Sequence, residues 1–196
     1  MVLCPSRASA AHALLPVPVG NSAAERWLKK PVLKPRLLDN MENPATWTRG
    51  GEGEITFTTE RSRDGGHSLR LQSNTKTDKP GRSLGRPFGY AAAVRHFPGQ
   101  DWSGFNRISF WVYPDLPGFY HVGLLVRLHN EGRELVPDVY NREGFNYLML
   151  NNREWNHVVW EVAHLARDKV TALDLQYALE GNEPEATGTA QFDFDQ

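Results

Sequence analysis

The chain has 196 residues, of which 40% are hydrophobic and 23% are charged, with a formal net charge of −1 and one cysteine. This length suits one domain with its own core, and the balanced charge excludes the basic surface of a general nucleic-acid-binding protein. A single cysteine, Cys4, excludes an internal disulfide and a thiolate metal site. No apolar run approaches the roughly 20 residues that a membrane-spanning helix needs.

Residues 1–36 are expected to form a partly ordered N-terminal extension. Ala, Pro and other small residues dominate its first half, and such a composition buries little apolar surface. A short helix is predicted over residues 22–30, because Asn21 or Ser22 can cap its first turn. Pro31 then ends helical structure.

From Leu37 onward, short runs rich in β-branched and aromatic residues alternate with turn residues. Clusters of Gly, Pro, Asn and Asp separate these runs, as they do between strands. The predicted strands cover residues 54–59, 68–72, 91–96, 107–113, 120–129, 145–150, 157–162, 171–179 and 189–195. Strands at this spacing, without a long amphipathic helix, predict an all-β protein, an antiparallel β-sandwich over residues 37–196.

Side-chain alternation predicts which faces of two strands are buried. In strand 107–113, Ile108, Phe110 and Val112 share one face. In strand 120–129 an apolar row occupies one face in the same way. The opposite faces carry large aromatic, basic and imidazole side chains: Trp111 and Tyr113 in the first strand, and His121, Arg127 and His129 in the second.

Four segments, taken in order, resemble a known family. They are Leu38-Asp39-Asn40-Met41-Glu42 followed by Trp47, Gly65-Gly66-His67-Ser68-Leu69-Arg70-Leu71, residues 101–113, and residues 155–162 with the terminal Phe192-Asp193-Phe194-Asp195. Together they resemble β-jelly-roll carbohydrate-binding modules and related galactose-binding-like domains, as found beside the catalytic domains of bacterial glycoside hydrolases. The resemblance implies a jelly-roll sandwich, an extracellular or periplasmic location, and glycan binding on a sheet face or at loop tips.

A glycan site combines flat aromatic rings with a few planar polar groups. The residues with this composition are Trp111, Tyr113, His121, Arg127 and His129, with Tyr147 and Gln176 bordering them from neighbouring strands. We hypothesise that sugars stack on Trp111 or Tyr113 while Arg127 and the histidines bind hydroxyls. In the alternative, both rings form a second core layer beneath the N-terminal segment and Arg127 makes a surface ion pair. A rival site is formed by the loop aromatics Phe88, Tyr90, Phe119, Tyr120 and Tyr140 with Arg142 and Asp138, and the loop 131–144 is long for a hairpin, as functional loops often are.

The resemblance also implies a structural calcium ion. Such modules commonly hold calcium with a carboxylate near the start of the domain, an aspartate in the last strand and backbone carbonyls. The matching positions are Glu42 and Asp195, with Asp39 as a further candidate, and calcium prefers oxygen ligands of this kind. The alternative is that these acids accept backbone N–H bonds at strand ends.

Catalysis has less support in the sequence. Asp138 with Glu143, or Asp174 with Glu161, would serve glycoside hydrolysis if their separation were right. No GxGxxG, P-loop or GxSxG sequence occurs, so nucleotide binding and serine hydrolysis have no motif.

We therefore predict a non-catalytic carbohydrate-associated module, an accessory domain of a glycoside hydrolase. Its expected partners are a glycan and a catalytic domain that follows in the parent chain, and neither a nucleic acid nor a membrane. One alternative is a scaffold domain that packs on a catalytic domain without binding sugar. Another is a small polysaccharide lyase or hydrolase on the same fold. The chain ends at Gln196, close to the predicted closing strand, so the module is expected to be truncated there.

Overall fold

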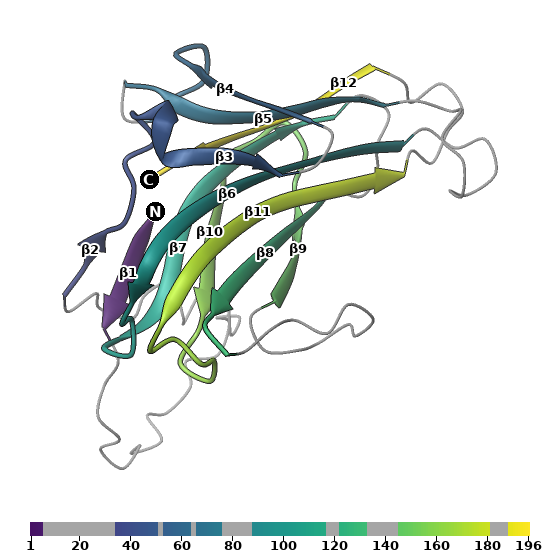
Figure 1. Cartoon of the computed structure of the whole chain (residues 1–196). Helices are drawn as coiled ribbons and strands as arrows, with labels where there is room; N and C mark the ends of the chain where they lie inside the picture. Colours follow the sequence, from purple (N-terminus) through teal and green to yellow (C-terminus); the bar gives the residue numbers. More distant parts are fainter. Residues whose placement is uncertain are drawn as a thin grey trace, which may run out of the picture.

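Two antiparallel sheets face each other and enclose one core (Figure 1). The computed structural model describes residues 1–5, 34–50, 53–63, 66–75, 88–116, 122–132, 145–180 and 188–196. Within this part of the chain, no helix combines the length and the apolar character that crossing a membrane requires.

Sheet A holds most of the strands. Its order is β2 (Arg36–Leu37), β1 (Val2–Pro5), β7 (Phe105–Asp115), β12 (Gly188–Asp195), β5 (Ser68–Thr75) and β4 (Glu54–Thr58), and β10 (Asn156–Glu161) also pairs with β7. Trp111 pairs with both β10 and β12, so these two strands flank β7 on opposite edges. Sheet A is therefore five strands wide along the order β10, β7, β12, β5 and β4.

Sheet B has five strands. Its order is β3 (Trp47–Gly50), β6 (Phe88–Gln100), β11 (Val170–Glu180), β8 (Val122–Asn130) and β9 (Phe145–Leu150), and a 3-10 turn, η1 (Pro44–Thr46), leads into β3. All neighbouring pairs are antiparallel. The all-β, antiparallel sandwich predicted from the sequence is confirmed, with five strands across each layer.

All nine predicted strands are present, and three strands were not predicted. These are β1, β2 and β3, which have 4, 2 and 4 residues. Runs this short do not show an alternating pattern that a sequence analysis can use. The predicted helix over residues 22–30 lies outside the described residues.

The first residues of the chain belong to sheet A. Met1 and Leu3 are fully buried, and β1 pairs with the first half of β7 while β12 pairs with its second half. The two strands therefore follow one another along one edge of β7, and the chain ends lie side by side (Figure 1). Residues 1–5 are therefore part of the sandwich, and the extension expected over residues 1–36 does not begin at Met1.

Both sheets contribute alternate residues to the core. In β7, Ile108, Phe110 and Val112 are buried as predicted. From sheet B, the ring of Tyr177 stacks on Phe192 of sheet A, with ring centroids 4.5 Å apart. Burial raises the pKa of the Tyr177 hydroxyl, which keeps it neutral as a hydrogen-bond donor.

Candidate functional site

The outer face of sheet B carries a group of polar side chains. Residues directly opposite each other on paired strands share a face, so the register defines rows across the sheet. One row runs Thr48, Val94, Asp174, Arg127 and Phe145. The next runs Gly50, Ala92, Gln176, Leu125 and Tyr147, and a third contains His96, Ala172 and His129.

The centre of this face is an ionisable pair. His129 Nε2 lies 2.8 Å from Asp174 Oδ2, and their side chains are 36% and 13% exposed. Arg127 stands directly opposite Asp174 in the register. The other carboxylate oxygen of Asp174, Oδ1, is buried and accepts no hydrogen bond from the described residues. A buried acceptor without a hydrogen bond destabilises the folded protein, and a donor from a bound molecule would remove this cost.

Small residues surround this polar centre. Ala92 and Ala172, on β6 and β11, are 4% and 8% exposed, and Gly50 stands beside Ala92. Short side chains here leave the space above the sheet to the longer polar groups. Gln176 and Arg127 are partly exposed, so they remain accessible from solvent.

The structure brings together most of the predicted polar residues. Arg127 and His129 lie on β8, Gln176 lies on β11, and Tyr147 lies on β9, at the register position next to Leu125. The backbone positions thus confirm that Tyr147 and Gln176 lie on the two strands next to β8. His121 and the loop 133–144 lie outside the described residues. Asp174 completes the set, and its alternation with Leu173 and Leu175 was the sequence signal for it.

The prediction that Trp111 and Tyr113 share this face is wrong. Both lie on β7 in sheet A, on that sheet's outer face, so the whole sandwich separates them from Arg127 and His129. Strands β7 and β8 follow each other in the chain but belong to opposite sheets. The same alternation of apolar and polar residues in two consecutive strands therefore does not show that their outward-facing side chains lie on one sheet.

Both faces of the Trp111 ring are covered. His157 of β10 stacks on it at 4.5 Å with an interplanar angle of 17°, and the Arg63 guanidinium lies 3.6 Å from the ring centroid. Arg63 N donates to Asp195 on β12, at 2.6 Å, whereas His157 comes from β10 on the opposite edge of β7. The two partners thus approach from opposite sides. Burial, and then the charge of Arg63, lower the pKa of His157, so a neutral imidazole is favoured in the stack.

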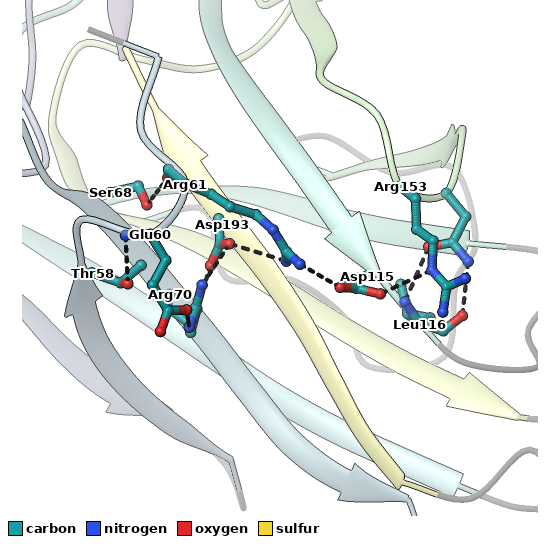
Figure 2. Close-up of polar contacts among 10 residues, drawn as sticks. Thr58, Glu60, Arg61, Ser68, Arg70, Asp115, Leu116, Arg153 and Asp193 are labelled. Carbon is teal, nitrogen blue, oxygen red and sulfur yellow. Dashed lines mark hydrogen bonds and ion pairs between the residues drawn. The ribbon is translucent and has the colours of Figure 1, made fainter. Parts of the chain in front are cut away.

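A network of alternating charges, formed by Arg61, Asp115, Asp193 and Arg153 (Figure 2), lies beside Tyr113. Arg61 lies over its ring at 4.7 Å, and the Arg61 guanidinium reaches Asp115 at 2.6 Å and Asp193 at 3.5 Å. Arg153 binds the other oxygen of Asp115 at 3.1 Å. Burial would raise the pKa of Asp115, but the hydrogen bonds from the two arginines outweigh burial and lower it. These contacts occupy the outer face of sheet A around Tyr113.

The three acids predicted to bind calcium are engaged by protein donors. Asp39 accepts hydrogen bonds from Met41 N on Oδ1 at 2.8 Å and from Thr46 Oγ1 on Oδ2 at 3.1 Å, and its Oδ2 forms an ion pair with Arg95, 2.9 Å from Nε. Asp195 accepts Arg63 N and Ser62 Oγ on Oδ2, and Gln196 N on Oδ1.

Glu42 is bound in the same way by His67. Its Oε1 accepts His67 N at 2.8 Å, and its Oε2 lies 2.7 Å from His67 Nδ1. The backbone hydrogen bond is the main cause of its lowered pKa. Within the described ranges, no three His, Cys, Asp or Glu residues form a group that could hold a metal ion. The three acids thus accept backbone N–H hydrogen bonds, as the alternative interpretation expected. Calcium binding at them stays a prediction.

One acid pair considered for hydrolysis is separated by the fold. Asp174 lies on the outer face of sheet B, whereas Glu161 lies on β10 in sheet A, where it pairs with Arg107. Two carboxylates on opposite sides of a sandwich cannot flank one glycosidic bond. Asp138 and Glu143 lie outside the described residues.

Comparisons with known proteins give matches in structure alone. No family model matches the chain, and no curated protein matches its sequence. Its structure is similar to a family 11 carbohydrate-binding module from Clostridium thermocellum in complex with a β-1,3-1,4-mixed-linked tetrasaccharide. The identity is 15% and the TM-score 0.49, over 80% of this chain and 90% of that one.

Family 22 modules match as well. One is the CBM22-2 xylan-binding domain from Paenibacillus barcinonensis Xyn10C, with 15% identity and a TM-score of 0.43 over 80% of this chain and 93% of that one. Another is the CBM22-1-GH10 protein of Clostridium thermocellum Xyn10B complexed with xylohexaose, with 12% identity and a TM-score of 0.44 over 80% of this chain and 26% of that one. The matches are to β-sandwich carbohydrate-binding modules at low identity, and they do not by themselves transfer a ligand.

Proposed function

We propose that this chain is a non-catalytic carbohydrate-binding module whose glycan lies on the outer face of sheet B. The observation that carries the proposal is the set of adjacent polar groups there. Arg127, His129, Asp174 and Gln176 are partly exposed and stand on neighbouring strands in matching register. The outer face of sheet A offers no comparable opening at Trp111, since both faces of that ring are covered.

These groups suit the hydroxyls of a sugar chain. A guanidinium donates in a fixed plane, an amide both donates and accepts, and a carboxylate accepts. The buried Oδ1 of Asp174, which accepts no hydrogen bond from the described residues, is an acceptor for which a ligand hydroxyl or a bound water would supply the donor. Such pairing gives orientation and specificity more than affinity.

We further propose that affinity comes from ring stacking on Tyr147. This residue stands in the row of Gln176 and Leu125, on the edge strand β9. A sugar presents an apolar C–H face that packs on an aromatic ring. Tyr147 takes the role that the sequence analysis gave to Trp111 and Tyr113. An accessory role beside a catalytic domain of a glycan-degrading enzyme follows from the family resemblance alone.

Affinity gels test the proposal directly. Mixed-linkage β-glucan and xylan are the first probes, because the similar modules from Clostridium thermocellum and Paenibacillus barcinonensis were solved with or named for these sugars. We expect Gln176→Ala to weaken retention roughly tenfold, since it removes an amide that can both donate a hydrogen bond to a sugar hydroxyl and accept one. Tyr147→Ala should remove retention.

The matched control is Gln191→Ala. Gln191 is a partly exposed glutamine on β12, in sheet A, so its loss should leave retention unchanged. Equal retention of Gln176→Ala and the native protein would contradict the proposed site. If the native protein is not retained on gels made with a broad panel of polysaccharides, the scaffold alternative replaces glycan binding.

A further inference from the structure

A cavity of about 390 Å³ lies where one side of the sandwich opens. Its lining residues are Trp47 and Arg49 from β3, and Glu54, Ile55, Thr56 and Phe57 from β4. β3 is the edge strand of sheet B and β4 is the edge strand of sheet A, and the two lie at the same side of the molecule (Figure 1). The cavity is therefore formed between the two layers and is distinct from the outer face of sheet B.

Strand β3 connects this cavity to the proposed glycan face. Its residues alternate, so Thr48 and Gly50 end the rows that contain Asp174 and Gln176. The alternate residues Trp47 and Arg49 line the cavity. A ligand lying across the rows would thus reach the cavity by passing over one edge strand.

Trp47 supplies an unused hydrogen-bond donor. The residue is 5% exposed, and its indole N–H has no acceptor among the described residues. Buried indole N–H groups normally find a partner, because they otherwise lose their hydrogen bond to water. A ligand oxygen in the cavity would supply the acceptor.

The other lining residues divide into apolar and polar groups. Ile55 and Phe57 are partly buried, whereas Arg49, Glu54 and Thr56 are exposed. Arg49 makes no hydrogen bond or ion pair with the described part of the chain, and Glu54 binds Gln72 through Oε2 alone, at 3.3 Å. One pyranose unit has matching chemistry, with an apolar ring face and a rim of hydroxyls.

We propose that the cavity is a second saccharide site, which takes one sugar unit at a side branch or chain end of a glycan bound on sheet B. This inference rests on the proposed function. The volume is at the lower end of the range for small-ligand sites, which fits a single unit rather than a chain. The site would make the module selective for branched or short glycans over long unbranched ones.

The test is an NMR titration of the ¹⁵N-labelled chain with methyl β-xyloside and methyl β-glucoside. We expect amide shifts in residues 47–49 and 54–57 at millimolar sugar. Arg49→Ala should weaken this binding roughly three- to tenfold, because a charged donor to a hydroxyl is lost. Trp47→Phe keeps a ring but removes the N–H, so it should weaken binding as well. Arg36→Ala, at an exposed arginine of another edge strand, is the matched control and should change nothing.

Each outcome separates this site from the proposed function. Gln176→Ala should weaken polysaccharide retention while the methyl glycosides still shift the β3–β4 residues. Shifts confined to the rows of sheet B would overturn the second site and leave the proposed function intact. Shifts at β3 and β4 that persist unchanged in Arg49→Ala would overturn the second site too. Retention absent from every gel, with β3–β4 shifts present, would overturn the proposed function and would leave the cavity as a site for single sugars, not for a branch of a glycan bound on sheet B.

Discussion

Arg70 and Asp193 form a two-pronged ion pair across adjacent strands β5 and β12. Arg70 Nε lies 2.7 Å from Asp193 Oδ1, and Arg70 Nη2 lies 3.0 Å from Asp193 Oδ2. Asp193 is fully buried, whereas the second partner of Arg70, Glu60, has a side chain that is 73% exposed. The hydrogen bonds that Arg70 donates to Asp193 are the largest effect on its pKa, and they raise it. One arginine thus binds one buried and one solvated carboxylate (Figure 2).

This difference predicts unequal effects of removing the two acids. Asp193→Ala leaves Arg70 and Arg61 without their buried counter-charge, and breaking a buried pair in this way costs about 3 kcal/mol. Glu60→Ala removes a solvated partner of the same arginine and should change stability little. Urea unfolding followed by fluorescence measures both. Equal loss in the two variants would show that burial of Asp193 does not matter.

Trp111→Ala should reduce stability without changing glycan affinity. The substitution removes a ring that packs against His157 and Arg63 on its two faces. A partly buried tryptophan in such a stack contributes about 2–3 kcal/mol. Thermal unfolding measures the loss, and affinity gels run well below the unfolding temperature measure binding. A variant that keeps its stability but loses retention would place the glycan on sheet A instead.

His157 makes stability depend on pH. Its pKa is lowered in the folded chain, first by burial and then by Arg63, so the unfolded chain binds its proton at higher pH. Its contribution is therefore fully present above the unfolded value of about 6.5, and it is lost as pH falls through the folded value. Urea unfolding at a series of pH values should show this loss, and His157→Phe should remove the His157 part of it.

Arg63→Gln tests the second cause of the same shift. Removing the nearby positive charge should raise the pKa of His157 toward its ordinary value. An NMR titration of the His157 ring proton reports this pKa directly. An unchanged value in Arg63→Gln would assign the whole shift to burial.

Gly53 permits a close approach where the chain crosses from β3 to β4. A Cβ built there would lie 2.1 Å from Ala91 Cβ and 2.6 Å from Gln72 O, whereas one at Gly104 would meet nothing within 4 Å. Gly53→Ala must displace the backbone, at a cost of about 2–3 kcal/mol. Gly104→Ala is the control and should be neutral or slightly stabilising. Similar unfolding midpoints for both variants would contradict the crowding at Gly53.

Much of the fold was predictable because strand patterns are local. The period-two alternation of Ile108, Phe110 and Val112 depends only on neighbouring residues, so it gave both the strand and its buried face. Arg127 and His129 share a face for the same local reason, since they are two residues apart on one strand, and their role in glycan binding stays a prediction. Asp174 and Gln176 share a strand in the same way.

The sequence by itself determined the nine longer strands, the buried faces of β7 and β8 and the polar side of β8. Only the tertiary structure decided that β7 and β8 belong to opposite sheets, which separates Trp111 from Arg127 and covers its ring with His157 and Arg63. It also decided that β1 joins sheet A and that β3 and β4 border a cavity. The physical reason is that alternation fixes a side chain relative to its own strand, whereas the choice of sheet depends on contacts between residues far apart in the chain.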